Sequence, residues 1–146
     1  MDIRIGFPRD LQVTADIDGF TVVTDQPPRA GGGGEAPTPF QLFLASMGTC
    51  AGVYYLGFLR QRGIPTAGAG ITMVPTFDPA SGLLTEVRMD VQLPAGFPEK
   101  YREAVVRAID VCAVKRSLGQ PPVFTVTTNV GDRQVVEECA LPAVGV

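Results

Sequence analysis

The sequence predicts an α+β domain in which antiparallel sheet surrounds two central helices. Alternating apolar and polar residues predict strands in three segments, residues 2–25, 67–93 and 123–130. Two apolar segments with cap residues at their ends predict helices over residues 38–62 and 98–119. The order of strands, helix, hairpin, helix and strand is typical of α+β domains with antiparallel sheet.

Residues 2–25 are expected to form a meander of two or three strands. The pair Asp18-Gly19 is a strong hairpin signal, and Pro8-Arg9-Asp10 supplies a second turn. Residues 26–37 follow as a loop with four consecutive glycines. A phosphate-binding loop is not expected there because the sequence Gly-Lys-Ser/Thr is absent, and a flexible connector is the better interpretation.

The first helix has clear end signals. Thr38 is a good N-cap residue, Gln41 completes a capping box with it, and Gly63 supplies a left-handed stop. The chain carries no charge between Ala36 and Leu59, and the apolar residues spread around the whole helix. Such a helix either spans a membrane or lies at the centre of a core. Polar residues interrupt it and strands flank it, so we expect a central helix covered by sheet and by another subunit.

The second half of the chain repeats the pattern of hairpin and helix. Two strands, Ile71–Phe77 and Leu83–Leu93, are expected to form a hairpin, and the helix over residues 98–119 follows. The apolar stripe of this helix includes Cys112, which should therefore face the core. After the strand at 123–130, residues 131–146 are expected to form a polar turn and a tail without an assigned element.

Composition excludes several classes of function. The 146 residues form one domain, residues 1–146, with a net charge of −3 and scattered Lys and Arg, which does not suit a nucleic-acid partner. The chain has no histidine, and its three cysteines show no Cys-x-x-Cys spacing, so neither a metal site nor a cofactor is expected. No export signal is visible, which predicts free thiols in a reducing cytoplasm. Thiol chemistry at Cys50 and Cys112 is the first candidate, whereas Cys139 is expected to be a small buried hydrophobe.

Two segments resemble the signatures of the OsmC/Ohr superfamily. The first signature, Pro-x-x-Leu-Leu-x-Ala-x-x-x-Cys at a helix start, is similar to Pro37-Thr-Pro-Phe-Gln-Leu-Phe-Leu-Ala-Ser-Met-Gly-Thr-Cys50. The second, a Cys-Pro-Val-like helix, is similar to Val111-Cys112-Ala-Val114 followed by Leu118. The order of elements also agrees, and the first segment looks closest to the OsmC-like branch of the superfamily.

The resemblance implies an OsmC-like fold, with antiparallel sheets wrapped around central helices in an intertwined homodimer. It also implies thiol-dependent reduction of organic hydroperoxides in a stress response, at sites on the subunit interface. In that scheme Cys50 is the attacking thiol and Cys112 the resolving thiol. An external dithiol would then reduce the disulfide, without a cofactor.

A catalytic arginine is also implied by the resemblance. Arg9 is the best match in this sequence, and Arg4 and Arg29 are alternatives. The glutamate that holds this arginine in peroxidase branches is replaced here by Phe40, while Glu35 lies nearby in the loop. We therefore expect an arginine without its carboxylate partner and a less activated Cys50.

Two other classes of function stay open. The absent glutamate favours a non-catalytic protein on the same fold that binds a small apolar or thiol-reactive ligand. A structural or partner-binding module is the third possibility. Whether the two helical cysteines can form a disulfide separates the enzyme from the binding protein.

Overall fold

A computed structural model describes the main chain of residues 1–131 and 133–139, and the side chains of residues 1–129 and 131. In chain order its elements are β1 (Ile3–Gly6), β2 (Val13–Ile17), β3 (Phe20–Thr24), η1 (Pro28–Ala30), α1 (Pro39–Gln61), β4 (Gly70–Phe77), β5 (Leu84–Gln92), η2 (Glu99–Tyr101), α2 (Arg102–Asp110), α3 (Ala113–Gly119), β6 (Phe124–Val130) and β7 (Arg133–Cys139). Over the described residues these strands pair as β1-β2-β3, β4-β5 and β6-β7, every pair antiparallel. The predicted α+β class with antiparallel sheet is therefore confirmed.

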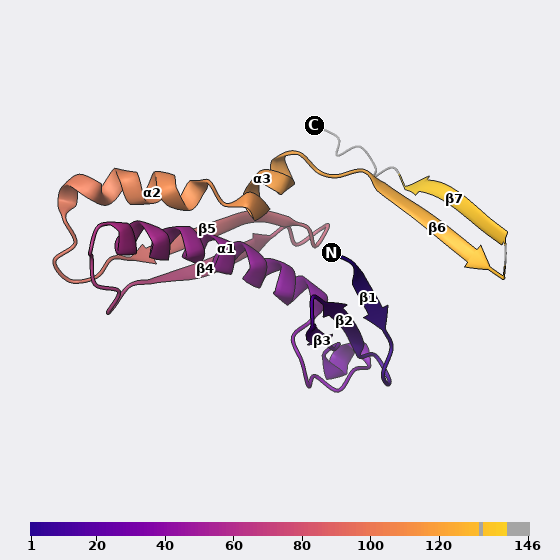
Figure 1. Cartoon of the computed structure of the whole chain (residues 1–146). Coiled ribbons are helices and arrows are strands. Elements are labelled where there is room, and N and C mark those ends of the chain that lie inside the picture. The colour runs from indigo at the N-terminus through magenta and orange to yellow at the C-terminus, as the bar shows by residue number, and fades with distance from the viewer. Residues whose placement is uncertain (132, 140–146) are drawn as a thin grey trace.

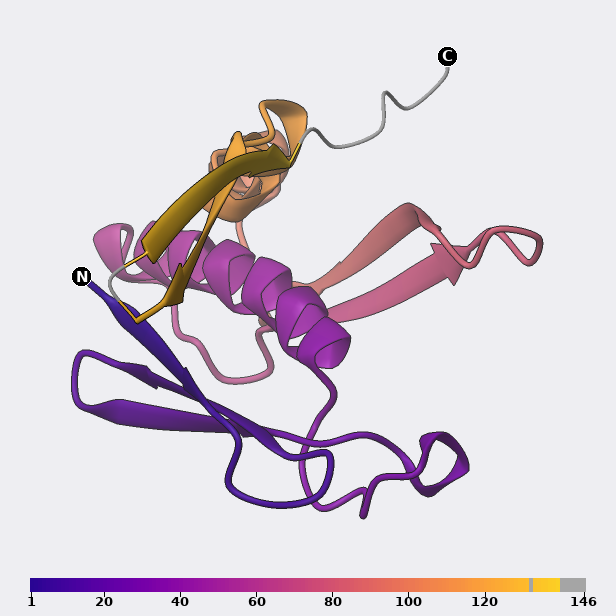
Figure 2. The ribbon, with the colours of Figure 1, turned by 90° about the vertical axis from the view of Figure 1, so that its right-hand side faces the viewer.

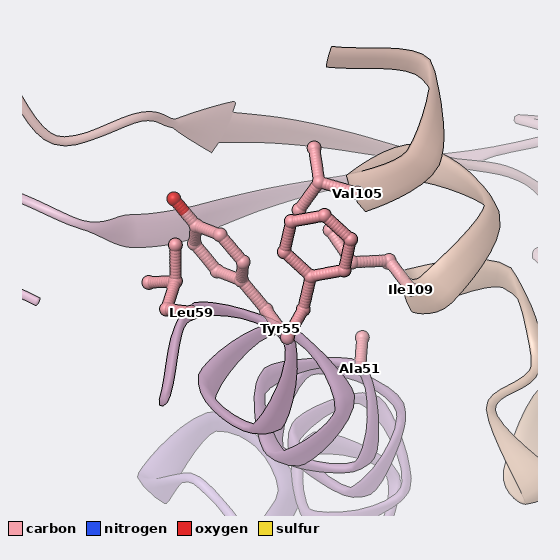
Figure 3. Packing of buried hydrophobic residues seen from close by; sticks show 6 residues of the cluster. Ala51, Tyr55, Leu59, Val105 and Ile109 are labelled. Carbon is pink, nitrogen blue, oxygen red and sulfur yellow. The ribbon is translucent and has the colours of Figure 1, made fainter. Parts of the chain in front are cut away.

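The core lies between the two longer helices and the β4-β5 hairpin (Figure 1). One stripe of α1 packs against α2, and Figure 3 shows the residues that meet there, Ala51, Tyr55, Phe58, Leu59, Val105 and Ile109. The Tyr55 hydroxyl donates a hydrogen bond of 2.7 Å to the main-chain carbonyl of Gln92 on β5. Helix and sheet are thereby joined at the point where the aromatic ring leaves the apolar layer.

The predicted limits of α1 are confirmed by its caps. The Gln41 amide donates to the Thr38 hydroxyl at 3.2 Å, and the Thr38 amide donates to the Gln41 side chain at 2.8 Å, which completes the capping box. At the other end Gly63 adopts a φ of 63°, a left-handed conformation that favours glycine and stops the helix. Local chemistry alone thus defines where α1 begins and ends.

The second helix is not continuous, and the prediction of one helix over residues 98–119 is wrong. It divides into η2, α2 and α3, and the chain leaves the helical region at Cys112, which has φ −51° and ψ 120° and caps α3. No proline or glycine marks this break in the sequence. After it α3 packs against α1, a tertiary contact that local propensity does not encode.

The hairpins agree with their turn signals, with one omission. Asp18 and Gly19 have φ values of 47° and 86°, which suit the two-residue turn between β2 and β3. The β4-β5 hairpin and β6 also lie where the alternation predicted strands. The sequence did not predict strand β7. In its sequence, Arg-Gln-Val-Val-Glu-Glu-Cys, polar and apolar residues occur in adjacent pairs, so the alternation typical of a strand is absent. Residues 140–146 of the expected tail lie outside the described residues.

The glycine-rich loop is ordered around a buried carboxylate, so the prediction of a flexible connector is wrong. Asp25 is only 1% exposed, and its carboxylate accepts main-chain hydrogen bonds from Gln26 at 2.7 Å and Glu35 at 3.0 Å. Its pKa is lowered chiefly by the Glu35 amide, with further main-chain donors at Gln26, Gly33 and Gly34 and an opposing effect of burial. A Cβ atom on Gly32 would lie 2.0 Å from the Gln26 carbonyl oxygen, so the close approach requires glycine there.

Large apolar surfaces remain uncovered in the single chain. Val53 on α1 is 69% exposed, although the opposite stripe of the same helix is buried. The β1-β2-β3 sheet and the β6-β7 hairpin lie apart from the helical core (Figures 1 and 2), and both carry exposed aromatic residues, Phe20 and Phe124. By length and composition alone, α1 is apolar enough to cross a membrane, a test that core helices also pass. Exposed apolar surface of this extent is typical of faces that contact another molecule.

Candidate active site

The fold brings the two helical cysteines together, although 62 positions separate them in the chain. Cys50 lies midway along α1 and is half-buried, whereas Cys112 is fully buried at the N-cap of α3. Neither forms a disulfide in this structure. The thiols meet because the break before α3 places Cys112 over the middle of α1.

Hydrogen bonding lowers the pKa of Cys50. The largest effect comes from the Cys112 side chain, and the Val114 and Ala113 amides add to it, while burial acts in the opposite direction. The Cys112 thiol also lies 4.0 Å from the Met47 carbonyl oxygen, which is its alternative acceptor. Ionisation of Cys50 therefore offers the Cys112 S–H group a stronger, charged acceptor.

The main-chain donors arise directly from the interrupted helix. The first amides of a helix have no intrahelical partner, and in α3 two of them face Cys50. A continuous helix would have used these amides in its own ladder, with no donor left for the sulfur. The break is thus the structural feature that stabilises a thiolate at Cys50.

Arg9 lies away from the thiol pair, in the turn between β1 and β2. Its guanidinium forms an ion pair with Glu35, and the Gln12 side chain donates to the same carboxylate at 2.9 Å. The expectation that Arg9 lacks a carboxylate partner is therefore wrong, because the ordered glycine loop presents Glu35 to it. No arginine is among the groups that lower the pKa of Cys50 within the described part of this chain.

Neither alternative arginine is among the groups that lower the pKa of Cys50. Arg4 lies on the exposed β1 strand and Arg29 lies in η1. Phe40, at the position of the expected glutamate, belongs to an aromatic cluster, with ring centroids 5.4 Å from Phe43 and 5.8 Å from Phe77. Its ring therefore packs against two other aromatic rings near the start of α1.

An apolar cavity of about 440 Å³ borders the thiol site. Met47, whose carbonyl faces the Cys112 thiol, forms part of its wall together with Met89 and Leu118. Lys115 stands in this wall and is paired with Asp110. The cavity is large enough for an organic group, and most of its lining residues are apolar.

The sequence identifies both cysteines but not the groups that act on them. The Ala113 and Val114 amides and the Met47 carbonyl belong to the main chain, which carries no residue-type signal. The side chain of Cys139 lies outside the described side chains. Among the residues that the structure describes, no three metal-ligating side chains come together.

Comparison with known proteins identifies a family and a fold. The family model described as OsmC-like protein matches residues 32–127, a range that contains both cysteines. A comparison with curated proteins finds no match.

Three solved structures share the fold. A protein from Psychrobacter arcticus 273-4, described as a putative osmotic stress induced and detoxification response protein, is 20% identical, with TM-score 0.68, covering 79% of this chain and 85% of its own. A structural genomics protein is 19% identical, with TM-score 0.62 and coverage of 83% and 91%. A protein from Legionella pneumophila, described as an organic hydroperoxide resistance protein OsmC, is 19% identical, with TM-score 0.52 and coverage of 80% and 87%.

Proposed function

This chain belongs to the OsmC-like protein family, and from that premise we propose that it is a thiol-dependent peroxidase that reduces organic hydroperoxides. The observation that carries the proposal is the meeting of Cys50 and Cys112, with the pKa of Cys50 lowered by the Cys112 side chain. The Legionella pneumophila protein of the same fold, described as an organic hydroperoxide resistance protein, is consistent with this activity.

The first step is attack of the Cys50 thiolate on the terminal oxygen of the hydroperoxide. A sulfur–oxygen bond forms, the O–O bond breaks, and the alkoxide takes up a proton and leaves as the alcohol. Cys50 is then a sulfenic acid. The hydrogen bonds from α3 serve this step because they raise the fraction of Cys50 present as thiolate, the reactive form.

The second step is condensation of Cys112 with the sulfenic acid. The Cys112 sulfur attacks the Cys50 sulfur, a disulfide forms, and the hydroxyl group leaves as water with the proton of the Cys112 thiol. An external dithiol restores both thiols by exchange through a mixed disulfide. Because Cys112 is fully buried and already next to Cys50, resolution requires no large movement.

The apolar cavity beside Met47 supports a preference for organic substrates. An alkyl or aryl group would gain from transfer out of water into this space, whereas hydrogen peroxide has no apolar surface to bury. The substrate class proposed is therefore a small organic hydroperoxide.

We further propose that the working form is a homodimer in the reducing cytoplasm. The exposed side of α1 and the exposed apolar residues of the β1-β2-β3 sheet and of β6 support a second copy as the covering partner. Two free thiols are consistent with a reducing compartment.

Consumption of cumene hydroperoxide with dithiothreitol as reductant tests the proposed activity. We expect turnover with cumene hydroperoxide and much slower turnover with hydrogen peroxide at the same concentration, because only the organic substrate uses the apolar cavity. Protein alkylated with iodoacetamide before the assay is the matched control and should be inactive. Unchanged thiols after prolonged exposure to the organic peroxide would overturn the proposal and favour a binding protein on the same fold.

The family resemblance implies an arginine that activates Cys50, and we propose that Arg9 takes this role in the dimer, although no arginine within the described part of the single chain lowers the pKa of Cys50. Replacing Arg9 with alanine should raise the pKa of Cys50 and slow its alkylation by iodoacetamide near neutral pH, because a nearby positive charge favours the thiolate. At a pH above the Cys50 pKa of both Arg9→Ala and the unmodified protein, the two proteins should be alkylated at equal rates. Arg88→Ala, which removes an exposed arginine of β5, is the control. Equal pH profiles for Arg9→Ala and the unmodified protein would show that Arg9 acts only in the ion pair with Glu35.

A further inference from the structure

A second cavity lies outside the thiol site, where the ordered loop, the start of α1 and the end of β4 meet. Its volume is about 640 Å³, within the range of small-molecule sites. Neither Cys50 nor Cys112 lines it. Its occupant therefore need not be a substrate of the peroxidase.

Aromatic and proline rings supply flat apolar surface to this cavity. Phe40 and Phe77 lie in its wall with ring centroids 5.8 Å apart, and they remain 44% and 41% exposed. Pro27 and Pro28 contribute from the loop, and Leu44 from the second turn of α1. A flat ring gains contact area on such surfaces at less cost in conformational entropy than a flexible chain does.

The loop side of the cavity is preformed. The buried Asp25 carboxylate holds the Gln26 and Glu35 amides, and the Asp25 amide donates to the Pro37 carbonyl at 3.2 Å. The chain between these points is closed by further bonds, including Gly34 to the Gln26 carbonyl at 3.0 Å. A ligand would therefore meet a wall that is already ordered, which reduces the entropic cost of binding.

Arg29 is the charged residue of this cavity. Among the described side chains it forms neither an ion pair nor a hydrogen bond, and the nearby carboxylate of Glu35 is engaged by Arg9. The other polar side chains of the wall belong to Thr38 and Gln41, and the oxygen atom of each accepts a hydrogen bond from the main-chain amide of the other residue in the capping box. The Arg29 guanidinium is thus the charged donor that this wall offers to a ligand, and its planar fork suits a carboxylate.

We propose that this cavity binds a small aromatic carboxylate. The ring would lie against Phe40 and Phe77, and the carboxylate would accept hydrogen bonds from Arg29. The combination of flat apolar walls with the Arg29 guanidinium distinguishes this ligand class from neutral aromatics and from small inorganic anions. A neutral ring would leave the guanidinium unpaired, and an inorganic anion would leave the phenyl rings uncovered.

Fluorescence titration with 2-naphthoate tests the proposal. The protein contains no tryptophan, so the naphthyl signal is readily observed. We expect saturable binding that Arg29→Gln weakens by about tenfold or more, since hydrogen bonds between charged groups are lost. The neutral probe 2-naphthalenemethanol should bind more weakly and be insensitive to Arg29→Gln. The control Arg88→Gln should not affect either probe.

Two further variants separate this site from the thiol chemistry. Phe77→Ala should weaken both probes, because it removes ring contact without changing charge. A double variant, Cys50→Ser with Cys112→Ser, should bind 2-naphthoate as the unmodified protein does. No saturable binding up to millimolar probe on the folded protein, or equal 2-naphthoate affinity for Arg29→Gln and the unmodified protein, would overturn the proposal whether or not the protein reduces hydroperoxides.

Discussion

Replacing Cys50 with serine is expected to abolish reduction of cumene hydroperoxide, because the attacking thiolate is removed. Replacing Cys112 with serine should instead permit one attack and leave Cys50 as sulfenic or sulfinic acid. In the unmodified protein, one equivalent of the peroxide should yield a disulfide between Cys50 and Cys112. Intact-mass and peptide mass spectrometry distinguish these three outcomes directly.

Cys139→Ser is the matched control for this series, since it removes a thiol that the proposed cycle does not use. It should form the same disulfide at the same rate. A disulfide that includes Cys139 instead, or full activity of Cys50→Ser, would contradict the assignment of the two thiols.

The pH dependence of this reaction follows from the lowered pKa of Cys50. As pH falls through that pKa, the thiolate takes up a proton and the rate of attack declines. Because the Cys112 thiol and the α3 amides stabilise the thiolate, the decline should occur below the range of an ordinary cysteine, about 8.5. Cys112→Ser should raise the midpoint less than loss of all these donors would, because a hydroxyl can still donate. The rate of iodoacetamide alkylation across pH measures the midpoint in both proteins.

The second large effect concerns assembly. We expect a homodimer that buries about 2,000 Å² or more, because the uncovered side of α1 and the exposed apolar residues of the β1-β2-β3 sheet and of β6 need a partner. A substitution at Val53 distinguishes a monomer from a dimer, because this side chain is 69% exposed in the single chain. In a monomer Val53→Asp would be tolerated, whereas in a dimer it would bury a charge in an apolar interface and disrupt assembly or folding.

Sedimentation and circular dichroism measure both aspects of this prediction. Gln61→Glu, which adds the same charge to an exposed position at the end of α1, is the control and should remain a folded dimer. A folded monomer of the unmodified protein at micromolar concentration would contradict the expected assembly, as would a Val53→Asp protein that remains a folded dimer.

Local features of the fold could be predicted because each depends on neighbouring residues. The capping box of Thr38 and Gln41 and the left-handed Gly63 set the ends of α1. The pair Asp18-Gly19 sets the two-residue turn between β2 and β3. Such features require no knowledge of distant segments, so the class of the fold followed from them.

Other features depend on distant contacts and could not be predicted. No proline or glycine in the sequence marks the helix break at Cys112. The break exists because α3 packs against α1. The partnership of Arg9 with Glu35 depends on a loop ordered by the buried Asp25. In both cases burial and packing across the fold outweighed local propensity and composition.

The sequence by itself therefore determined the antiparallel α+β class, the limits of α1 and the two cysteines that carry the candidate chemistry. Only the tertiary structure decided that these thiols meet and that free amides of α3 stabilise Cys50. The physical reason is that a thiolate is stabilised by donors within hydrogen-bonding distance, and here those donors are main-chain groups exposed by a helix break. The sequence identifies side chains by residue type. The positions of the main-chain groups that act at this site depend on the path of the folded chain, so only the structure shows them.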